Sequence, residues 1–273
     1  MLKQMGAPAE ADLISCLMVT RLSADRIARV AASISTFQAQ TYAPRELVIL
    51  IDDSAETAER AILHQIIRAS GPAPIRIATR PGRPTLGSLR NESIREAMGE
   101  YVCQWDDDDI YHPERLAAQL AALRAGNHEA VYLQEVLQFF PETRALYWTN
   151  WRATESGGHP GSLFMRRDLP VRYPTEGAEA RLGEDLVLAR ALWGRGKVGL
   201  LAEAPHLFAY VSHGANSWAA DHHGMLAREL AISRGLLMRR ETSLRQGLPR
   251  LDLGQGAIQV CGANGPAFIV NAV

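Results

Sequence analysis

The first half of the chain alternates short apolar runs with segments whose apolar residues recur at helical spacing. Four apolar runs have the length of buried strands, at residues 13–20, 46–51, 75–79 and 101–105. Helical spacing fills the intervals, at residues 25–40, 56–69 and 89–98 and in a helix from Pro113 to Gly126. We expect Ser23 to cap the first helix and Gly99 to end the third. This alternation predicts an α/β fold, with a mainly parallel sheet flanked by helices.

The second half of the chain has a less regular pattern. We predict strands at residues 130–139, 163–166 and 207–211, a helix at 184–193 and a long amphipathic helix at 218–240. The tail, residues 247–273, is rich in glycine and carries short apolar runs, which indicates an edge hairpin or a contact with a partner. We therefore expect one domain built from two halves, followed by a C-terminal helix and tail: residues 1–125, 126–215 and 216–273.

Acidic residues follow two of the predicted strands. Asp52 and Asp53 come after the second strand, and four aspartates at 106–109 come after the fourth. Ligands of parallel sheets bind beyond the carboxyl ends of the strands, so both clusters should line one crevice. Residues two apart at the end of a strand point to the same side, so Asp106 and Asp108 can face one Mg²⁺ or Mn²⁺ ion. The alternatives are a solvated acidic turn at 106–109 and turn capping by Asp52 and Asp53.

Composition narrows the class of protein only a little. The 273 residues can bury a sizeable core, and a net charge of -1 gives no reason to expect nucleic-acid binding. Cys16, Cys103 and Cys261 lack metal-ligand spacing, and we expect buried free thiols, in keeping with a reducing compartment. The sequence has no run of about 18 apolar residues and no signal-peptide layout. We therefore expect a cytoplasmic protein without a membrane span, and peripheral membrane contact stays open.

Three segments, taken in order, carry a resemblance to known proteins. Residues 33–54 read SISTFQAQTYAPRELVILIDDS, residues 89–109 read LRNESIREAMGEYVCQWDDDD, and residues 183–192 read GEDLVLARAL. With these segments the chain resembles the family 2 glycosyltransferases of the GT-A fold, over about residues 13–215. The resemblance implies a Rossmann-like nucleotide-binding half at 1–125. It also implies a fused acceptor-binding half at 126–215 that supplies the catalytic base.

The resemblance implies roles for individual positions around the acidic crevice. The nucleotide-sugar donor would be held by a set of polar and charged side chains: Thr20, Arg21, Asp52, Asp53, Arg80, Arg90, Asp106 and Asp107. The metal would be held by Asp106 and Asp108, with His213 completing the shell or bonding the diphosphate. Surface ion pairs for Arg80 and Arg90 and a structural role for His213 are the alternatives.

The start of the predicted helix at 184–193 is the expected source of the catalytic base. The resemblance implies that Asp185 takes the acceptor proton and that Glu184 orients the acceptor hydroxyl or the loop. The helix dipole favours a carboxylate there and should keep Asp185 ionised near neutral pH, although acidic residues commonly begin helices in any protein. The resemblance also implies an acceptor side whose rings either stack on sugars or fill the core: Trp148, Trp151, His159 and Arg166.

The function implied by the resemblance is that of an inverting, metal-dependent hexosyltransferase. The donor would be a nucleotide-sugar, with UDP favoured by family frequency, and the acceptor a saccharide, lipid or other hydroxyl. The donor sugar, the acceptor and the oligomeric state, homo-oligomers included, stay open.

Two rival classes of protein remain. A nucleotidyltransferase would normally show a glycine-rich basic signature that residues 13–22 lack. A catalytically silent nucleotide-sugar-binding protein would not need both the aspartate set and the Glu-Asp pair.

Overall fold

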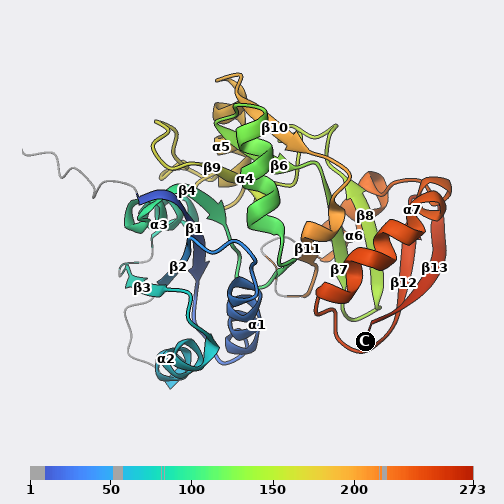
Figure 1. Ribbon diagram of the computed structural model, residues 1–273, viewed down its shortest axis with the longest axis horizontal. Helices are drawn as coiled ribbons and strands as arrows, with labels where there is room; N and C mark the ends of the chain where they lie inside the picture. The colour runs from blue at the N-terminus through green and yellow to red at the C-terminus, as the bar shows by residue number, and fades with distance from the viewer. Residues whose placement is uncertain are drawn as a thin grey trace, which may run out of the picture.

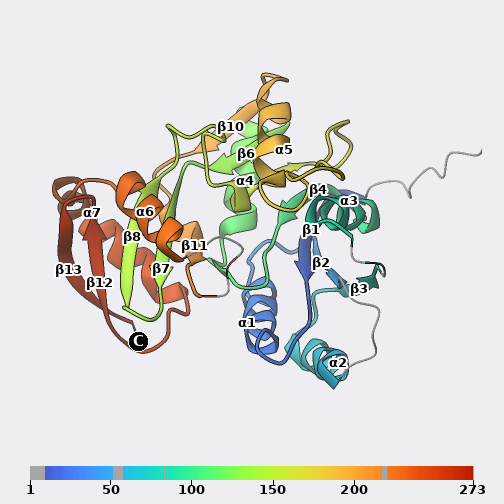
Figure 2. The same ribbon diagram turned by 180° about the vertical axis from the view of Figure 1, so that it is seen from behind.

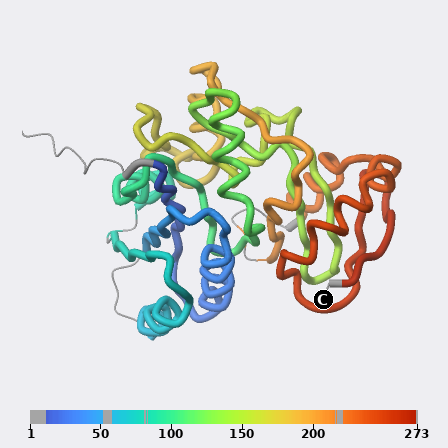
Figure 3. Tube along the Cα trace, in the orientation of Figure 1, coloured from blue at the N-terminus to red at the C-terminus, as the bar shows by residue number. Residues whose placement is uncertain are grey.

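The computed structural model describes residues 10–51, 58–80, 82, 84–214, 216 and 220–272. These residues form two sheets that lie side by side, with helices packed around them (Figure 1). The N-terminal part of the trace forms one side of the molecule and the C-terminal part the other (Figure 3). Among the described helices, none is long and apolar enough to cross a bilayer.

The first sheet has seven strands in the order β10-β6-β9-β4-β1-β2-β3. Its strands are β1 (Glu10–Thr20), β2 (Arg45–Ile51), β3 (Ile75–Thr79), β4 (Gly99–Gln104), β6 (Ala130–Leu133), β9 (Phe164–Arg166) and β10 (Val198–Leu201). All neighbours pair in parallel except β9, which runs antiparallel between β4 and β6. The predicted α/β fold with a mainly parallel sheet is therefore confirmed.

Helices cover both faces of the first sheet, as the side-chain alternation of its strands requires. On β1, Cys16 and Met18 pack with three helices on one face: α1 (Ile27–Gln38), α2 (Ala58–Ser70) and α4 (Arg115–Ala125). Leu17 of the same strand points the other way, toward α3 (Leu86–Glu96) and α5 (Glu184–Trp193). The continuous apolar sequence of the strands thus reflects burial on two sides.

The second sheet has six strands in the order β13-β12-β8-β7-β11-β5. They are β5 (Ile110–Tyr111), β7 (Glu135–Phe140), β8 (Ala145–Asn150), β11 (Phe208–Val211), β12 (Gly256–Gly262) and β13 (Gly265–Ala272). Helix α7 (Arg234–Gly247) crosses β12 and β13 on one face, and α6 (Ala220–Leu230) lies against β8 on the other (Figures 1 and 2). The tail forms the edge hairpin that its sequence indicated.

Two long predicted elements are each divided in the structure. The predicted strand 130–139 is two strands, β6 and β7, which belong to different sheets. The chain changes sheets at Gln134, whose N–H donates to the Leu201 carbonyl while its own carbonyl accepts from the Trp151 N–H. The predicted helix 218–240 is α6 and α7, separated at residues 231–233.

Several predicted helix ends also differ from the structure. Helix α1 begins after Arg26, and Ser23 is not its cap, because the Ser23 hydroxyl bonds the Asp25 carboxylate instead. Helix α3 begins at Leu86, where the Thr85 hydroxyl accepts from the Ser88 N–H at 3.2 Å. Gly99 begins β4 rather than ending α3. Helix α4 begins at Arg115, two residues after the predicted start at Pro113, while its end at Gly126 and the bounds of α5 agree with the prediction.

Candidate active site

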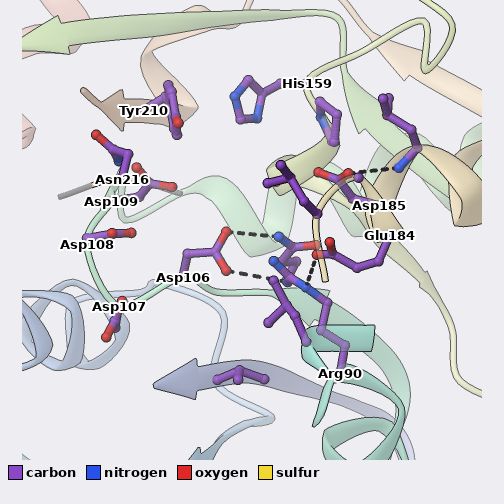
Figure 4. A pocket seen from close by; sticks show the side chains of 18 of the residues that line it. Arg90, Asp106, Asp107, Asp108, Asp109, His159, Glu184, Asp185, Tyr210 and Asn216 are labelled. Carbon is purple, nitrogen blue, oxygen red and sulfur yellow. Dashed lines mark hydrogen bonds and ion pairs between the residues drawn. The ribbon is translucent and has the colours of Figure 1, made fainter. Parts of the chain in front are cut away.

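A cavity of about 560 Å³ opens at the carboxyl ends of the first sheet, between that sheet and the second (Figure 4). The first sheet contributes Thr20 at the end of β1 and the aspartate turn 106–109 after β4. The segment 159–161 and the start of α5 form a second side. Residues of β7, β11 and α6 close the cavity from the second sheet. Both motifs that the sequence singled out for chemistry therefore line the same cavity.

The four aspartates do not share one direction, because β4 ends at Gln104 and they occupy a turn. Strand alternation therefore does not govern them, and each carboxylate has its own partners. Asp106 accepts from Gln104 Nε2 at 2.9 Å and from an Arg90 guanidinium nitrogen at 3.4 Å. Asp107 accepts from the Thr20 hydroxyl and is ion-paired with Arg26, whose Nε lies 3.2 Å away.

The other two aspartates of the turn reach toward the second sheet. Asp108 Oδ2 lies 3.2 Å from His213 Nε2 and 3.4 Å from an Arg26 nitrogen. Burial raises the pKa of Asp108, but the hydrogen bond from His213 and the charge of Arg26 bring it below its ordinary value. Asp109 is buried and accepts from the Val211 N–H at 2.8 Å. Burial and then the charge of Asp108 raise the pKa of Asp109 well above its ordinary value.

The expected gathering of Asp106, Asp108 and His213 around one ion is not observed. Within the described part of the chain, no three His, Cys, Asp or Glu side chains stand close enough together to hold a metal. Asp106 is turned toward Arg90 and Gln104, whereas Asp108 and His213 already contact each other. A carboxylate and an imidazole are suitable donors for Mn²⁺, so the residues fit a metal whose remaining ligands come from substrate oxygens.

The start of α5 brings two carboxylates to the cavity. Gly183, with a left-handed φ of 92°, turns the chain into the helix, and the buried Glu184 accepts from Arg90 Nε at 2.9 Å. Burial alone would lower the pKa of Arg90, but the charges of Asp106 and Glu184 raise it. Arg90 therefore links the aspartate turn to the start of α5, as Figure 4 shows.

Asp185, the second carboxylate at the start of α5, lies in a largely buried environment. Burial, followed by the charge of Glu184, raises the pKa of Asp185 from 3.8 to about 6. The helix dipole was expected to keep Asp185 ionised near neutral pH, and burial opposes that effect by raising the pKa of the group. With a pKa of about 6, Asp185 is still mostly ionised at neutral pH and is well matched to accept a proton.

The remaining predicted residues have different outcomes. Thr20 and Arg21 line the cavity. Arg80 does not line the cavity. Its side chain is nearly half exposed and is ion-paired with Glu92, as the alternative of a surface ion pair predicts. Asp52 and Asp53 lie outside the described residues. Trp148 is buried in the core of the second sheet, so its ring fills the core, whereas Trp151 and His159 line the cavity.

Sequence reasoning missed several lining residues. Arg26 was assigned only to a helix, yet it is the main cationic partner of Asp107. Arg181 lines the cavity, and no described residue forms an ion pair with it. Gln138 and Tyr210 enter the cavity from strands of the second sheet. Only the partition of the chain into two sheets brings these last two residues close to the aspartates, and the sequence pattern did not show that partition.

Comparison with known proteins identifies a family match and one curated relative of similar sequence. The chain matches the family described as Glycosyl transferase family 2 over residues 15–175. It is 27% identical over 103 residues to the Escherichia coli UDP-Glc:alpha-D-GlcNAc-diphosphoundecaprenol beta-1,3-glucosyltransferase WfgD, a stretch that is 38% of this chain and 39% of that protein. The chain thus matches about two-fifths of the length of this curated relative.

Solved structures show the same fold at low sequence identity. S. aureus TarS 1-349 in complex with UDP-GlcNAc has a TM-score of 0.57 and 14% identity, covering 89% of this chain and 68% of that one. The mannosyltransferase PcManGT from Pyrobaculum calidifontis, in complex with GDP-Man and Mn2+, has a TM-score of 0.58 and 15% identity, covering 90% and 67%. At such identities the likeness shows the fold alone. Because the family match takes in more than half of the chain, the protein belongs to glycosyl transferase family 2.

Proposed function

We propose that the protein is an inverting, metal-dependent glycosyltransferase that moves a sugar from a nucleotide-sugar to an acceptor hydroxyl. The observation that carries the proposal is the link through Arg90, which contacts both Asp106 of the aspartate turn and Glu184 beside Asp185. Through this link, the aspartate turn and Asp185, whose pKa is raised, line the same cavity. Family membership supports the reaction class.

The chemical step follows from the position of Asp185 at the cavity. Asp185 accepts the proton of the acceptor hydroxyl as the hydroxyl oxygen attacks the anomeric carbon of the donor sugar. The bond from that carbon to the diphosphate oxygen breaks in the same displacement, so the anomeric configuration inverts. Glu184 accepts a hydrogen bond from Arg90, and its role is to hold the start of α5 against this arginine.

The departing diphosphate needs positive charge near the aspartate turn. Asp108 and His213 would hold Mn²⁺ or Mg²⁺, and Asp106 would join them by turning away from Arg90 and Gln104, which it contacts in this structure. The ion would offset the charge that develops on the diphosphate. Arg181, a cation with no ion pair to a described residue, lines the same cavity and would contact phosphate oxygens. Thr20, Arg21, Arg90 and Asp107 complete the proposed donor side, with Asp52 and Asp53 added by their place in the motif.

Similar proteins support the donor class. WfgD is a UDP-Glc glucosyltransferase, and the TarS and PcManGT structures are complexes with UDP-GlcNAc and with GDP-Man and Mn2+. Two of these three donors carry UDP, which is the nucleotide that we propose for this chain.

The proposal keeps residues 1–125 as the donor half and 126–215 as the acceptor half. A cytoplasmic site of action is also part of it, supported by three free, buried cysteines.

A nucleotide panel tests the donor site. UDP, GDP, CMP and TDP are added with and without Mn²⁺, and the melting temperature is measured. A ligand at a hundredfold excess over its Kd stabilises the native state by about 2.7 kcal/mol, which gives a clear shift. We expect a metal-dependent shift with UDP. Asp108→Ala should lose the metal-dependent part of the shift. If no nucleotide stabilises the protein even with Mn²⁺, the proposed donor site is wrong.

Turnover separates the proposal from its rivals. Asp185→Asn should keep the UDP shift and lose sugar transfer, because the amide cannot accept the acceptor proton. Normal transfer by Asp185→Asn would contradict the assignment of the base. Release of pyrophosphate from a nucleoside triphosphate would instead identify a nucleotidyltransferase. Binding of UDP-sugars without turnover on any acceptor would identify a silent binding protein.

A further inference from the structure

The outer edge of the second sheet is formed by a long strand without charged residues. β13 pairs with β12 on one side, and no described strand lies on its other side (Figures 1 and 2). Its sequence, GPAFIVNA, contains no Asp, Glu, Lys or Arg. The pairing with β12 is irregular beside Pro266 and regular from Phe268 to Ala272. This regular stretch is therefore an open sheet edge.

The other sheet edges of the described chain are shorter or carry a charge. In the first sheet, β10 has four residues and β3 has five, one of which is Arg76. The second sheet ends on its other side in β5, which has two residues. Short strands and charged side chains at an edge hinder pairing with another strand, whereas a long uncharged edge favours it. Among these edges, β13 is therefore the one suited to bind a further strand.

The hydrogen-bonding direction of β12 follows from its pairing with β8. The Gln259 N–H donates to the Arg144 carbonyl beside β8 at 2.9 Å. Successive residues of a paired strand direct their backbone groups to opposite sides. The N–H and C=O groups of Ile258 and Val260, on either side of Gln259, therefore point toward β13.

The same alternation identifies the outward-facing groups of β13. Val270 and Phe268 are the partners of the two β12 residues that point toward β13, so their backbone groups face β12. The N–H and C=O groups of Ile269 and Asn271 then point out of the sheet. In agreement, the Ile269 carbonyl accepts from the Arg245 guanidinium of α7 at 2.8 Å rather than from β12. Two residues thus present backbone donors and acceptors at the edge.

The side chains of this stretch leave one face of the edge open. Val270 is buried in an apolar cluster with Leu237 and Leu244 of α7. Ile269 points to the opposite face and is 55% exposed, and Asn271 beside it is exposed as well. The edge therefore combines open backbone groups with an exposed apolar side chain.

We propose that two copies of this chain associate by antiparallel pairing of their β13 strands, which joins their second sheets into one. Ile269 and Asn271 lie symmetrically about Val270. A two-fold axis at Val270 therefore places Ile269 of each copy opposite Asn271 of the other, and each pair exchanges two backbone hydrogen bonds. The carbonyl that Arg245 contacts has two lone pairs and can accept a second bond. This contact is isologous, and one pairing closes both open edges.

The charges near the edge are compatible with a second copy. Arg245, which reaches the edge from α7, is ion-paired with Glu241 of its own helix at 2.7 Å. Its charge is therefore neutralised on each side of the two-fold axis. The two Ile269 side chains become diagonal neighbours on the same face of the joined sheet, where they cover each other. An apolar contact of this kind fits a second copy of the edge better than a charged strand.

The size of the contact predicts a reversible dimer. One pair of strands covers less than the about 800 Å² per partner of a standard stable interface. We therefore expect a dimer that is populated at about 100 µM chain and dissociates at about 1 µM. β13 lies at one end of the second sheet, whereas β7 and β11, which line the cavity, lie toward the other end. Each copy thus keeps its own open cavity.

Sedimentation equilibrium of the full chain over this concentration range tests the pairing. Ile269→Pro removes an outward N–H and leaves the ladder between β12 and β13 intact, because proline is tolerated at an edge position whose N–H faces solvent. This variant should weaken association by at least about tenfold, since the pairing exchanges hydrogen bonds at this residue.

A charge at the same position provides a second variant. Ile269→Lys brings two added charges close together across the two-fold axis and should also weaken association by at least about tenfold. Ile62→Lys is the matched control. Ile62 is 42% exposed on α2, at the other side of the molecule, so this variant should dimerise as the wild type does (Figure 1).

Circular dichroism and the melting temperature at about 1 µM, where the chain is monomeric, show whether each variant is folded. A wild type that stays monomeric at about 100 µM overturns the pairing. A dimer that folded Ile269→Pro and Ile269→Lys form as readily as the wild type also overturns it, because the interface then lies elsewhere. If Ile269→Pro does not fold, Ile269→Lys alone decides. None of these outcomes depends on the proposed glycosyl transfer.

Discussion

Adjacent carboxylates at the start of α5 have different surroundings and therefore different properties. Glu184 is buried against the Arg90 guanidinium, whereas Asp185 forms no salt bridge with a described residue and lies where burial raises its pKa to about 6. The catalytic base must be ionised to accept a proton. We therefore expect kcat for transfer to be constant above about pH 7 and to fall about tenfold per pH unit below the pKa of Asp185.

The pH profile of kcat under saturating donor and acceptor is the measurement for this prediction. The UDP thermal shift, followed over the same pH range, reports whether the protein still binds the donor. A kcat that stays flat down to about pH 5 would show that Asp185 does not act as the base. A fall in both kcat and the UDP shift would instead point to the donor site, because Asp185 is not part of it.

The motifs predicted which residues lie at the cavity, but not the contacts that those residues make with partners far away in sequence. The motif located Asp106, Asp108 and Asp185, which all line the cavity. It did not show that Arg26, more than 80 residues earlier, pairs with Asp107. No local pattern encodes such a contact, since α1 meets the aspartate turn only when β1 and β4 pair side by side.

At the scale of elements, helix caps offer a direct comparison of prediction and structure. Ser233 caps α7, with its hydroxyl accepting from the Leu236 N–H at 3.3 Å, whereas Ser23, the predicted cap of α1, makes no such bond. Loss of a serine cap usually costs about 1 kcal/mol. Ser233→Ala should therefore lower the free energy of unfolding by about that amount, and Ser23→Ala by less than about 0.5 kcal/mol.

Urea denaturation of the two serine variants measures this difference. Equal losses of stability for Ser233→Ala and Ser23→Ala would mean that the α7 cap adds nothing beyond an ordinary surface serine.

The cap at Ser233 also bears on why residues 218–240 were predicted as one helix. Apolar residues keep their helical spacing through residues 231–233, and the cap and the pairing of Ile232 with the Trp148 carbonyl decide the break.

The contact between α1 and the aspartate turn has a consequence for metal binding. Arg26 is 26% exposed and pairs with Asp107 and Asp108, so it places a positive charge beside the proposed metal ligands. Arg26→Gln should destabilise the protein by about 1 to 3 kcal/mol without metal, because the buried Asp107 loses its cation. Millimolar Mn²⁺ should recover part of that loss.

Thermal unfolding of Arg26→Gln with and without Mn²⁺ checks this prediction. The matched control is Arg190→Gln on α5, where the arginine is 54% exposed and pairs with surface glutamates. The control should change little in either condition. A loss in Arg26→Gln that Mn²⁺ does not reduce would argue against a metal at the aspartate turn.

At the scale of the molecule, the site forms where two sheets meet, and the sequence predicted only one of them well. Strand and helix alternate regularly through residue 125, so strands β1 to β4 of the first sheet and its acidic edge could be read from periodicity, whereas β10 at Val198–Leu201 was not predicted. The second sheet takes strands from residues 110, 135, 145, 208 and 256 onward, and such long-range pairings have no local period. Tyr210 and Gln138 of the cavity were missed for this reason.

The C-terminal hairpin tests whether the second sheet is one structural unit. Ile258 of β12 is fully buried in the same apolar cluster as Leu137 and Trp148, whereas Ile269 of β13 is 55% exposed. Removal of a buried isoleucine side chain beyond Cβ costs roughly 2 to 5 kcal/mol, and an exposed one little. Ile258→Ala should therefore lower the melting temperature strongly and Ile269→Ala hardly at all.

Neither isoleucine lines the cavity, so at temperatures below the unfolding transition both variants should bind UDP as the wild type does. Equal melting temperatures would show that the hairpin is not part of the core. A loss of UDP binding in folded Ile258→Ala would show that the second sheet also shapes the donor site.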